Sequence, residues 1–366
     1  MAGCTNSTSN NIADLTKRDN ISITDFVDCI DVIQLESSEQ ALFNSIDKII
    51  SYGDYYYIFD ARQQSVLCFD HAGDFKYKIN SVGRGPEEYV YIGYFNIDPY
   101  NNRLMLLQPM GAIFYYDLDG KFIEKISLPS ECGSYNEVHS INEDTLLFVS
   151  LYEFDFVYYS STDNKIVKQI FPIDRDILPP EPLGRVYQYQ DSIYFASVVS
   201  ENETYNLSTN TISIDYKWDF GKLNYTKRQI QTLYNDYIAV QRANMMPLYF
   251  NDLVKEGRFI DYFIMSSRET NRYRIASVSV DNGAIYVVYD KNNKKSYVID
   301  KTTEGIQPYF TSRNVTNESF ILWDYGPSFQ YKYYDLSVLN DQQKGIINNH
   351  NPEQDNPFLV VYHLKQ

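Results

Sequence analysis

The stretch Tyr116-Asp117-Leu118-Asp119-Gly120-Lys121-Phe122 decides the fold, because it reads as a tight β-hairpin and recurs along the chain. One apolar strand ends at its first residue, and a second strand resumes at its last. The polar turn between them carries a glycine, which readily adopts the positive φ that tight hairpins need. A close copy is Phe69-Asp70-His71-Ala72-Gly73-Asp74-Phe75, and looser copies begin at Tyr159, Leu207 and Tyr289.

The spacing of these hairpins predicts a repeated unit. Successive copies are about 43 to 48 residues apart, except for the last, which follows a longer gap. A step of this size is typical of one four-stranded blade of a β-propeller. Between residues 45 and 301, short apolar runs separated by polar turns predict five such units.

A sixth unit is predicted to use both ends of the chain. Three strands are expected near the C-terminus, at residues 308–312, 319–325 and 358–364, and residues 30–36 can supply the fourth. Pairing the two ends would remove the open sheet edges. We therefore predict an all-β fold, a six-bladed β-propeller of four-stranded antiparallel blades, with the ring closed by an N-terminal strand joined to three C-terminal strands. A seven-bladed ring or a two-sheet sandwich is the alternative.

Composition supports a β-rich fold and excludes some partners. The chain of 366 residues contains 35 Tyr and 21 Phe, which favour strands. Its net charge is -16, and no stripe of Lys and Arg is present, so we expect no nucleic-acid partner. No apolar run reaches about 18 residues, so we expect no membrane-spanning helix.

The cysteines point to the cell envelope rather than to a metal. Cys4, Cys29, Cys68 and Cys132 form no CxxC pair, and we expect no metal and no cofactor. Met1-Ala2-Gly3-Cys4, followed by a polar run, resembles the end of a bacterial lipoprotein signal. We expect lipidation at Cys4, a flexible tether over residues 1–20, and one propeller domain over residues 21–366. An accidental Ala-Gly-Cys is the alternative.

Motifs spread along the chain resemble one family. They are Ile33-Gln34-Leu35-Glu36, Val82-Gly83-Arg84-Gly85-Pro86-Glu87-Glu88-Tyr89 and Asn356-Pro357-Phe358-Leu359-Val360-Val361-Tyr362-His363-Leu364-Lys365. Together with the hairpins, they resemble the opening strand, signature and closing strand of six-bladed β-propeller lipoproteins of Bacteroidota (NHL/TolB-like). Glu87 departs from the family's usual glycine. The resemblance implies the fold and a lipid anchor in the envelope, at the outer-membrane surface or in the periplasm, but no catalytic residues.

One face of the predicted ring carries the longer loops. Because strand direction alternates within a blade, loops 84–89, 177–184, 222–258 and 326–357 should share a face, opposite the tight hairpins. The two long loops are insertions into the propeller domain. The first has apolar residues at helical spacing after Thr226, which could cap a helix. Each insertion could be a lid over the ring or a structural plug.

Candidate ligand-binding residues lie in or near these loops. They are Arg84, Glu87, Glu88, Tyr89, Arg185, Tyr187, Arg242, Asn244 and Arg258. Arginine could bind a carboxylate or a sugar hydroxyl, and the carboxylates could bind hydroxyls or a cation. Equally, the 82–89 stretch could only shape the crossover between the first two blades.

Catalytic patterns are poor. The four histidines are scattered, and the chain has no GxSxG, HExxH or phosphate-binding glycine loop. We therefore predict a non-catalytic binding or interaction module that meets a glycan, a peptide or an envelope protein through one propeller face. A hydrolase or lyase with its active site in the central funnel is the first alternative. A structural subunit of an outer-membrane complex is the second.

Overall fold

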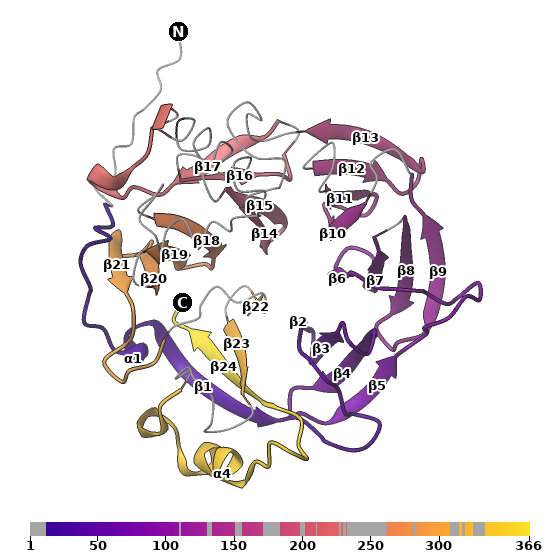
Figure 1. The fold of residues 1–366 in the computed structure, drawn as a ribbon, viewed down its shortest axis with the longest axis horizontal. Coiled ribbons are helices and arrows are strands. Elements are labelled where there is room, and N and C mark those ends of the chain that lie inside the picture. The colour runs from indigo at the N-terminus through magenta and orange to yellow at the C-terminus, as the bar shows by residue number, and fades with distance from the viewer. Residues whose placement is uncertain are drawn as a thin grey trace, which may run out of the picture.

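A computed structural model of the protein describes residues 12–109, 111–129, 134–150, 156–170, 184–197, 202–209, 211–226, 228–229, 232, 262–280, 283–307, 315–316, 319–324 and 334–366. In this part of the chain, the strands form six four-stranded sheets with antiparallel pairing. Figure 1 shows the six sheets arranged around a common centre, with one strand of each sheet nearest to it. The predicted all-β, six-bladed propeller is confirmed.

Blades 1 to 3 follow the chain order from the innermost strand outward. Blade 1 contains β2 (Lys48–Tyr52), β3 (Tyr55–Asp60), β4 (Ser65–Asp70) and β5 (Phe75–Ile79). Blade 2 contains β6 (Tyr94–Asp98), β7 (Arg103–Gln108), β8 (Ala112–Asp117) and β9 (Phe122–Ser127). Blade 3 contains β10 (Tyr135–Ser140), β11 (Thr145–Ser150), β12 (Phe156–Ser160) and β13 (Lys165–Ile170).

Blades 4 and 5 repeat this order, and blade 6 combines both chain ends. Blade 4 contains β14 (Gly184–Tyr189), β15 (Ser192–Ser197), β16 (Glu203–Asn206) and β17 (Ser213–Lys217). Blade 5 contains β18 (Tyr262–Glu269), β19 (Tyr273–Val280), β20 (Gly283–Asp290) and β21 (Lys295–Ile299). Blade 6 contains β22 (Val315–Thr316), β23 (Ser319–Asp324), β24 (Phe358–Leu364) and the outer strand β1 (Val27–Gln34).

Ring closure by the two chain ends is therefore confirmed. β1 pairs with β24 through a register that includes Ile33 opposite Leu359 and Asp31 opposite Val361. The innermost strand of blade 6, β22, pairs with β23 through Val315 and Thr316. The strand predicted at residues 308–312 lies outside the described residues.

Hydrogen bonds within the turn explain why the first polar residue of the two most similar hairpins is an aspartate. Asp117 Oδ1 accepts hydrogen bonds from the backbone N–H groups of Asp119 (3.0 Å) and Lys121 (2.8 Å), and Gly120 has a φ of 80°. Asp70 accepts in the same way, from the N–H groups of Ala72 and Asp74. The short carboxylate thus satisfies turn N–H groups that no strand partner reaches. At the hairpin after β20, the positive φ of 58° falls on Lys294 rather than on an asparagine.

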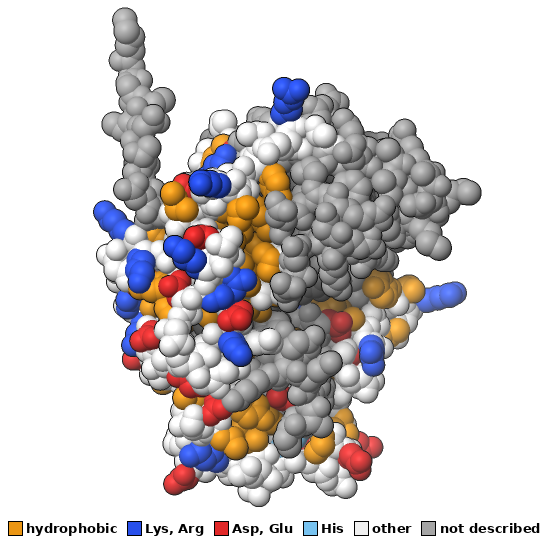
Figure 2. Space-filling model, turned by 60° about the vertical axis from the view of Figure 1, so that its left-hand side comes forward, with side chains coloured by type: hydrophobic (Ala, Val, Ile, Leu, Met, Phe, Trp, Pro, Cys, Tyr) orange, Lys and Arg blue, Asp and Glu red, His pale blue; other side chains and the backbone are white. Residues whose placement is uncertain are grey.

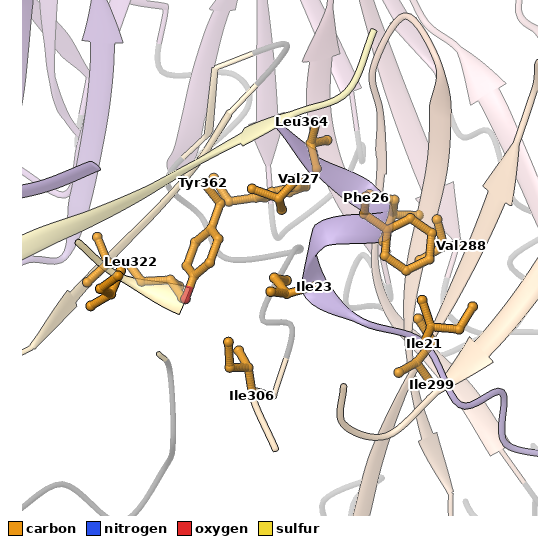
Figure 3. Close-up of a cluster of buried hydrophobic side chains, with 14 of the residues drawn as sticks. Ile21, Ile23, Phe26, Val27, Val288, Ile299, Ile306, Leu322, Tyr362 and Leu364 are labelled. Atoms are coloured by element: carbon orange, nitrogen blue, oxygen red, sulfur yellow. The ribbon is translucent and has the colours of Figure 1, made fainter. Parts of the chain in front are cut away.

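The core lies between adjacent blades. Alternate residues of each strand pack against the next sheet, which produces clusters of buried Tyr, Phe, Leu, Ile and Val side chains. Figure 3 shows the cluster between blades 5 and 6, where Ile23 and Phe26 lie near Val288 and Tyr362. Both come from the short helix α1 (Ile23–Phe26), which leads into β1.

The segment before α1 also packs on the propeller. Ala13 and Leu15 are buried against Trp218 and Phe220 after blade 4, and the Asp19 N–H donates to the Val298 carbonyl of β21. Contact with the ring thus begins within the predicted tether of residues 1–20. Residues 1–11 lie outside the described part of the chain.

Part of each predicted insertion is described. Thr226 and Gln229 form reciprocal cap bonds, with Thr226 Oγ1 accepting from the Gln229 N–H at 3.3 Å, as expected for a helix start. In the second insertion, α4 (Asp341–Asn349) lies outside the ring against β1, where Gln343 Nε2 donates to the Ile30 carbonyl (Figure 1). This helix therefore covers the outer edge of blade 6. No helix among the described residues has both the length and the apolar character to cross a membrane.

Candidate functional site

The crossover between blades 1 and 2, Val82–Tyr89, is a rigid loop. The Tyr89 N–H donates to the Ser81 carbonyl and the Gly83 N–H donates to the Tyr89 carbonyl, both at 3.0 Å, so the two ends of the loop lie side by side. Two glycines, a proline and a carboxylate fill the space between those ends. The loop is therefore fixed by backbone bonds before any partner is considered.

Glu88, although exposed, is hydrogen-bonded to the backbone of this loop. Its carboxylate Oε2 accepts the Gly85 N–H at 2.7 Å. A Cβ atom at Gly83 would lie 1.9 Å from the same oxygen, so only glycine leaves room for the carboxylate there. Glu88, a predicted ligand contact, thus has a structural role in the crossover.

Tyr89 joins the two blades. It is 0% exposed, and its ring makes an edge contact with Phe114 of β8 at 5.6 Å between centroids. Its hydroxyl donates to the Gln64 carbonyl (2.8 Å) and accepts the Ser81 N–H (3.1 Å). Burial raises the pKa of Tyr89 to about 12, so the hydroxyl stays protonated. This predicted site residue lies in the core and is not among the residues that meet solvent.

The rest of the crossover is presented to solvent. Val82, Val90 and Tyr91 are 50%, 63% and 53% exposed, and Arg84 and Glu87 are also exposed. We call these five residues the connector surface. Exposed aliphatic and aromatic side chains next to an arginine have the composition of protein–protein contact sites.

A second polar set lies on the innermost strands of blades 1 to 3. Lys48 of β2 donates to the Phe95 carbonyl of β6 at 2.9 Å and lies over the Tyr94 ring at 4.0 Å. Asn96 of β6 donates to the Val138 carbonyl of β10 at 2.8 Å. Each contact crosses from one blade to the next, so the set fastens neighbouring inner strands together.

His139 of β10 belongs to the same set. We call its members, Lys48, Tyr94, Asn96, Glu137 and His139, the axial set. Its Nε2 lies 3.2 Å from Glu137 Oε2, and its Nδ1 lies 3.3 Å from the Asn96 amide nitrogen. Burial lowers the pKa of His139, and the imidazole is therefore neutral at pH 7. A neutral imidazole between an amide and a carboxylate can hold a polar group, but its ring nitrogens are already engaged within the set.

An ionic cluster lies between blades 4 and 5. Glu269 Oε1, at the end of β18, accepts from Arg274 Nε (3.1 Å) and Lys291 Nζ (2.5 Å). Arg274 also approaches Asp215 of blade 4 at 3.6 Å and lies over the Tyr216 ring at 4.1 Å. Among the described residues, Glu269 Oε2 has no hydrogen-bond partner.

The predicted residue Tyr187 belongs to the edge of this cluster. It is buried, stacks on Tyr194 with centroids 5.4 Å apart, and its hydroxyl lies 3.3 Å from the Tyr216 hydroxyl. Burial raises its pKa well above the ordinary value. Nearby, burial lowers the pKa of half-buried Arg268 to about 9. Tyr187, like Tyr89, is buried in the protein core rather than facing solvent.

The other predicted site residues are less completely described. Arg185 lies on β14, where its backbone pairs with Ala196, but its side chain lies outside the described part. Arg242, Asn244, Arg258 and the lipidation candidate Cys4 also fall outside the described residues. A ligand-binding role for any of the nine residues stays a prediction.

Among the described residues, no group of three or more His, Cys, Asp and Glu is placed to hold an ion. His71 contacts Ser51, His139 contacts Glu137, His350 contacts Gln34, and His363 contacts Asp31.

Most residues of the connector surface and of the axial set could not be identified from the sequence. Val82, Val90 and Tyr91 are apolar residues of the kind that is normally inside, so the sequence does not indicate their exposure. The usable signal for Lys48, Tyr94, Asn96 and Glu137 is their place near the start of a repeated unit, since the first strand of a blade lies nearest the centre (Figure 1). The partners that hold them come from other blades and are not visible in local sequence.

Comparisons with known proteins agree with this architecture. Residues 7–363 match the family model described as "Domain of unknown function (DUF4934)". The chain is similar to the crystal structure of a "putative exported protein" from Bacteroides fragilis, with a TM-score of 0.73 and 15% identity over 96% of this chain and 98% of the other. It is also similar to a member of the DUF4221 family from Bacteroides vulgatus, with a TM-score of 0.55 and 11% identity over 93% and 97%. A comparison with curated proteins gave no match.

Proposed function

We propose that this chain, which belongs to the family described as a domain of unknown function (DUF4934), is an interaction module of the cell envelope that binds a partner protein through the connector surface. The observation that carries the proposal is the contrast within one short crossover. Buried Tyr89 and the hydrogen bond accepted by Glu88 fix the loop, while Val82, Val90 and Tyr91 are at least half exposed.

These contacts preorganise the crossover loop for binding. Ordering a flexible loop costs free energy on binding, and a loop already held by buried contacts avoids most of that cost. Valine, tyrosine and arginine then supply apolar area, an aromatic ring and directional donors, which is the composition of binding hot spots. A peptide or glycan could use the same surface, and these partners are alternative outcomes of the test below.

A photo-crosslinking amino acid placed at position 90 tests the proposal in living cells. We expect one discrete protein adduct from position 90, and we expect Tyr91→Ala or Arg84→Ala to reduce it severalfold. Position 123 is the matched control, because Ile123 on outer strand β9 is 48% exposed but lies away from the crossover. Equal adducts from both positions, or none from position 90, would contradict a specific partner at this surface.

Envelope location is the second part of the proposal. It is supported by the Ala-Gly-Cys sequence at Cys4 and by the exported description of the Bacteroides fragilis neighbour. Metabolic labelling with an alkyne fatty acid should label the full-length protein and should not label Cys4→Ala. A protein that takes up no lipid, or a Cys4→Ala variant that is still labelled, would remove the anchor from the proposal.

A hydrolase or lyase in the central funnel is less well supported. His139 and Glu137, acid–base candidates on the innermost strand β10, are engaged with each other and with Asn96. General acid–base catalysis needs such groups within reach of a substrate proton rather than only of each other.

A further inference from the structure

Three polar side chains of blade 6 form a connected row. Ser319 Oγ on β23 lies 3.1 Å from His363 Nδ1 on β24, and His363 Nε2 lies 2.8 Å from Asp31 Oδ2 on β1. Both distances are hydrogen-bond distances. When Nε2 carries the imidazole proton, it donates to the carboxylate, and Nδ1 accepts the serine hydroxyl proton.

Strand register explains why these residues meet. Ser319 is directly opposite His363, and His363 is opposite Cys29. Asp31 is two residues beyond Cys29 on the same strand, and alternate residues share a face of the sheet, so all three side chains lie on one face. Because β1 comes from the other end of the chain, the row exists only after the ring has closed.

Exposure allows a small molecule to reach the row. The side chains of His363 and Asp31 are 38% and 56% exposed, while Ser319 is 9% exposed. The imidazole and the carboxylate are thus accessible to solvent, and Ser319 keeps a small exposed fraction. Solvent around Asp31 weakens its interaction with the imidazole relative to a buried carboxylate.

The neighbouring blade supplies a hydroxyl close to the row. Ile321 and Val361, each two residues from a member of the row, pack in one cluster with Tyr56 of β3. Burial and, to a smaller extent, the charge of Asp31 raise the pKa of Tyr56 to about 12. Its hydroxyl is therefore a proton donor at neutral pH, and the ring lies 4.7 Å from that of His71.

We propose that Ser319 is a nucleophile for acyl transfer from small activated esters, with His363 as its general base and Asp31 as a positioning residue. Serine Oγ forms a bond to the acyl carbon while His363 takes the hydroxyl proton. The ester C–O bond breaks, and the leaving alkoxide receives that proton. Water then attacks the acyl-serine, again with His363 as base, and releases the acid and the free hydroxyl.

This activity is separate from partner binding by the connector surface. It places nucleophilic chemistry on the closing blade rather than in the central funnel. The two can fail independently, because the row and the crossover share no residue.

A fluorophosphonate probe tests the proposal directly on the full-length protein. We expect covalent labelling that peptide mass spectrometry assigns to Ser319, with no label at that position in Ser319→Ala. Loss of the base in His363→Gln should slow labelling by about 100-fold or more, the usual contribution of a general base. A folded wild-type protein that is not labelled at Ser319, or His363→Gln labelled at the wild-type rate, would overturn the proposal.

A substitution at Asp31 provides a second test. It should not prevent folding, because the Asp31 side chain is largely exposed. Asp31→Asn should slow labelling by roughly tenfold, less than for a buried triad carboxylate, and Asp31→Glu should restore part of the rate. His71→Ala is the matched control: it removes a nearby imidazole outside the row and should leave labelling unchanged. If Asp31→Asn and His71→Ala both label at the wild-type rate, Asp31 does not position His363. If p-nitrophenyl acetate is not hydrolysed faster by the wild type than by Ser319→Ala, the deacylation step is wrong.

Discussion

The interface between blades 1 and 2 and the interface between blades 4 and 5 occupy equivalent places in the ring but are built from different side chains. The first is mainly apolar, with Tyr57, Phe95 and Phe114 fully buried around Tyr89. The second includes the ionic cluster, in which Glu269 meets Arg274 and Lys291. Figure 2, turned toward the left-hand side of Figure 1, shows lysine and arginine side chains interspersed with acidic ones on that face.

The difference shows that propeller geometry does not prescribe the chemistry that joins blades. Apolar packing is not weakened by salt, whereas ion pairs between partly exposed side chains are screened by it. The interface between blades 1 and 2 and the interface between blades 4 and 5 should therefore be weakened by different conditions. The following variants probe that contrast.

Tyr89→Ala should have the largest effect. It removes a fully buried ring and two hydrogen bonds, and should lower the free energy of unfolding by about 4 kcal/mol. Tyr89→Phe keeps the ring and should cost about 1 kcal/mol. Urea denaturation measures both. Equal losses for the two variants would mean that the hydroxyl, and not apolar packing, joins blades 1 and 2.

Glu269→Gln should have the next largest effect. It keeps the side-chain shape but leaves Arg274 and Lys291 without their carboxylate. Breaking a buried pair costs about 3 to 5 kcal/mol, and we expect about 2 to 3 because these two side chains are 27% and 23% exposed. A cycle with Arg274→Gln should show coupling of at least about 1 kcal/mol. Strict additivity in that cycle would argue against a working ion pair.

Gly83→Ala should have a moderate effect. The new Cβ would displace the Glu88 carboxylate from the Gly85 N–H, at a cost of about 1 to 2 kcal/mol. Glu88→Ala is the control, and the double variant should be no less stable than Glu88→Ala alone, because nothing remains to collide with. An additional loss in the double variant would show that another contact excludes a side chain at position 83.

Glu304→Gln should have the smallest effect on the free energy of unfolding. This effect should be present at neutral pH and lost in strong acid. Burial raises the pKa of Glu304, but hydrogen bonds from Ser22, Thr302 and the Ile23 N–H prevail and lower it to about 2. Because the folded pKa is depressed, its stabilisation is present above the unfolded value of about 4.3 and is lost as pH falls through about 2. After allowance for solvent screening, we expect a difference of about 1 kcal/mol between wild type and Glu304→Gln at pH 7.

Denaturation of both proteins at several pH values measures this difference. It should vanish near pH 2. A difference that persists unchanged there would mean that the Glu304 carboxylate does not hold the N-terminal segment to the ring.

Local patterns predicted most of the fold. Tyr55–Asp60, Ser65–Asp70 and Ala112–Asp117 are strands with the expected bounds, because apolar runs end at residues that cap tight turns. The pairing of the chain ends was also predictable, since a missing strand at one end matched a spare strand at the other. The short innermost strand β22 was not foreseen, because two residues carry no periodicity.

The candidate site was less predictable. The crossover was found from its glycines and proline, but the sequence could not tell that Tyr89 is buried and Glu88 is hydrogen-bonded within the loop, while Val82 and Val90 face solvent. In the sequence alone, Glu269 and Arg274 are ordinary charged residues beside a turn. Their significance depends on Asp215 and Tyr216 of another blade, which only the folded ring brings close.

Because the first strand pairs with the last, this pairing can form only after almost the whole propeller has been synthesised. Asp31 and His363 are 332 residues apart in the chain. At about 5 to 20 residues per second, a ribosome needs roughly 20 to 60 seconds to make the partner of β1 after β1 itself. During that interval β1 is an unpaired edge, open to pairing with other chains. The nascent protein is thus most vulnerable to aggregation just before its last strand is made.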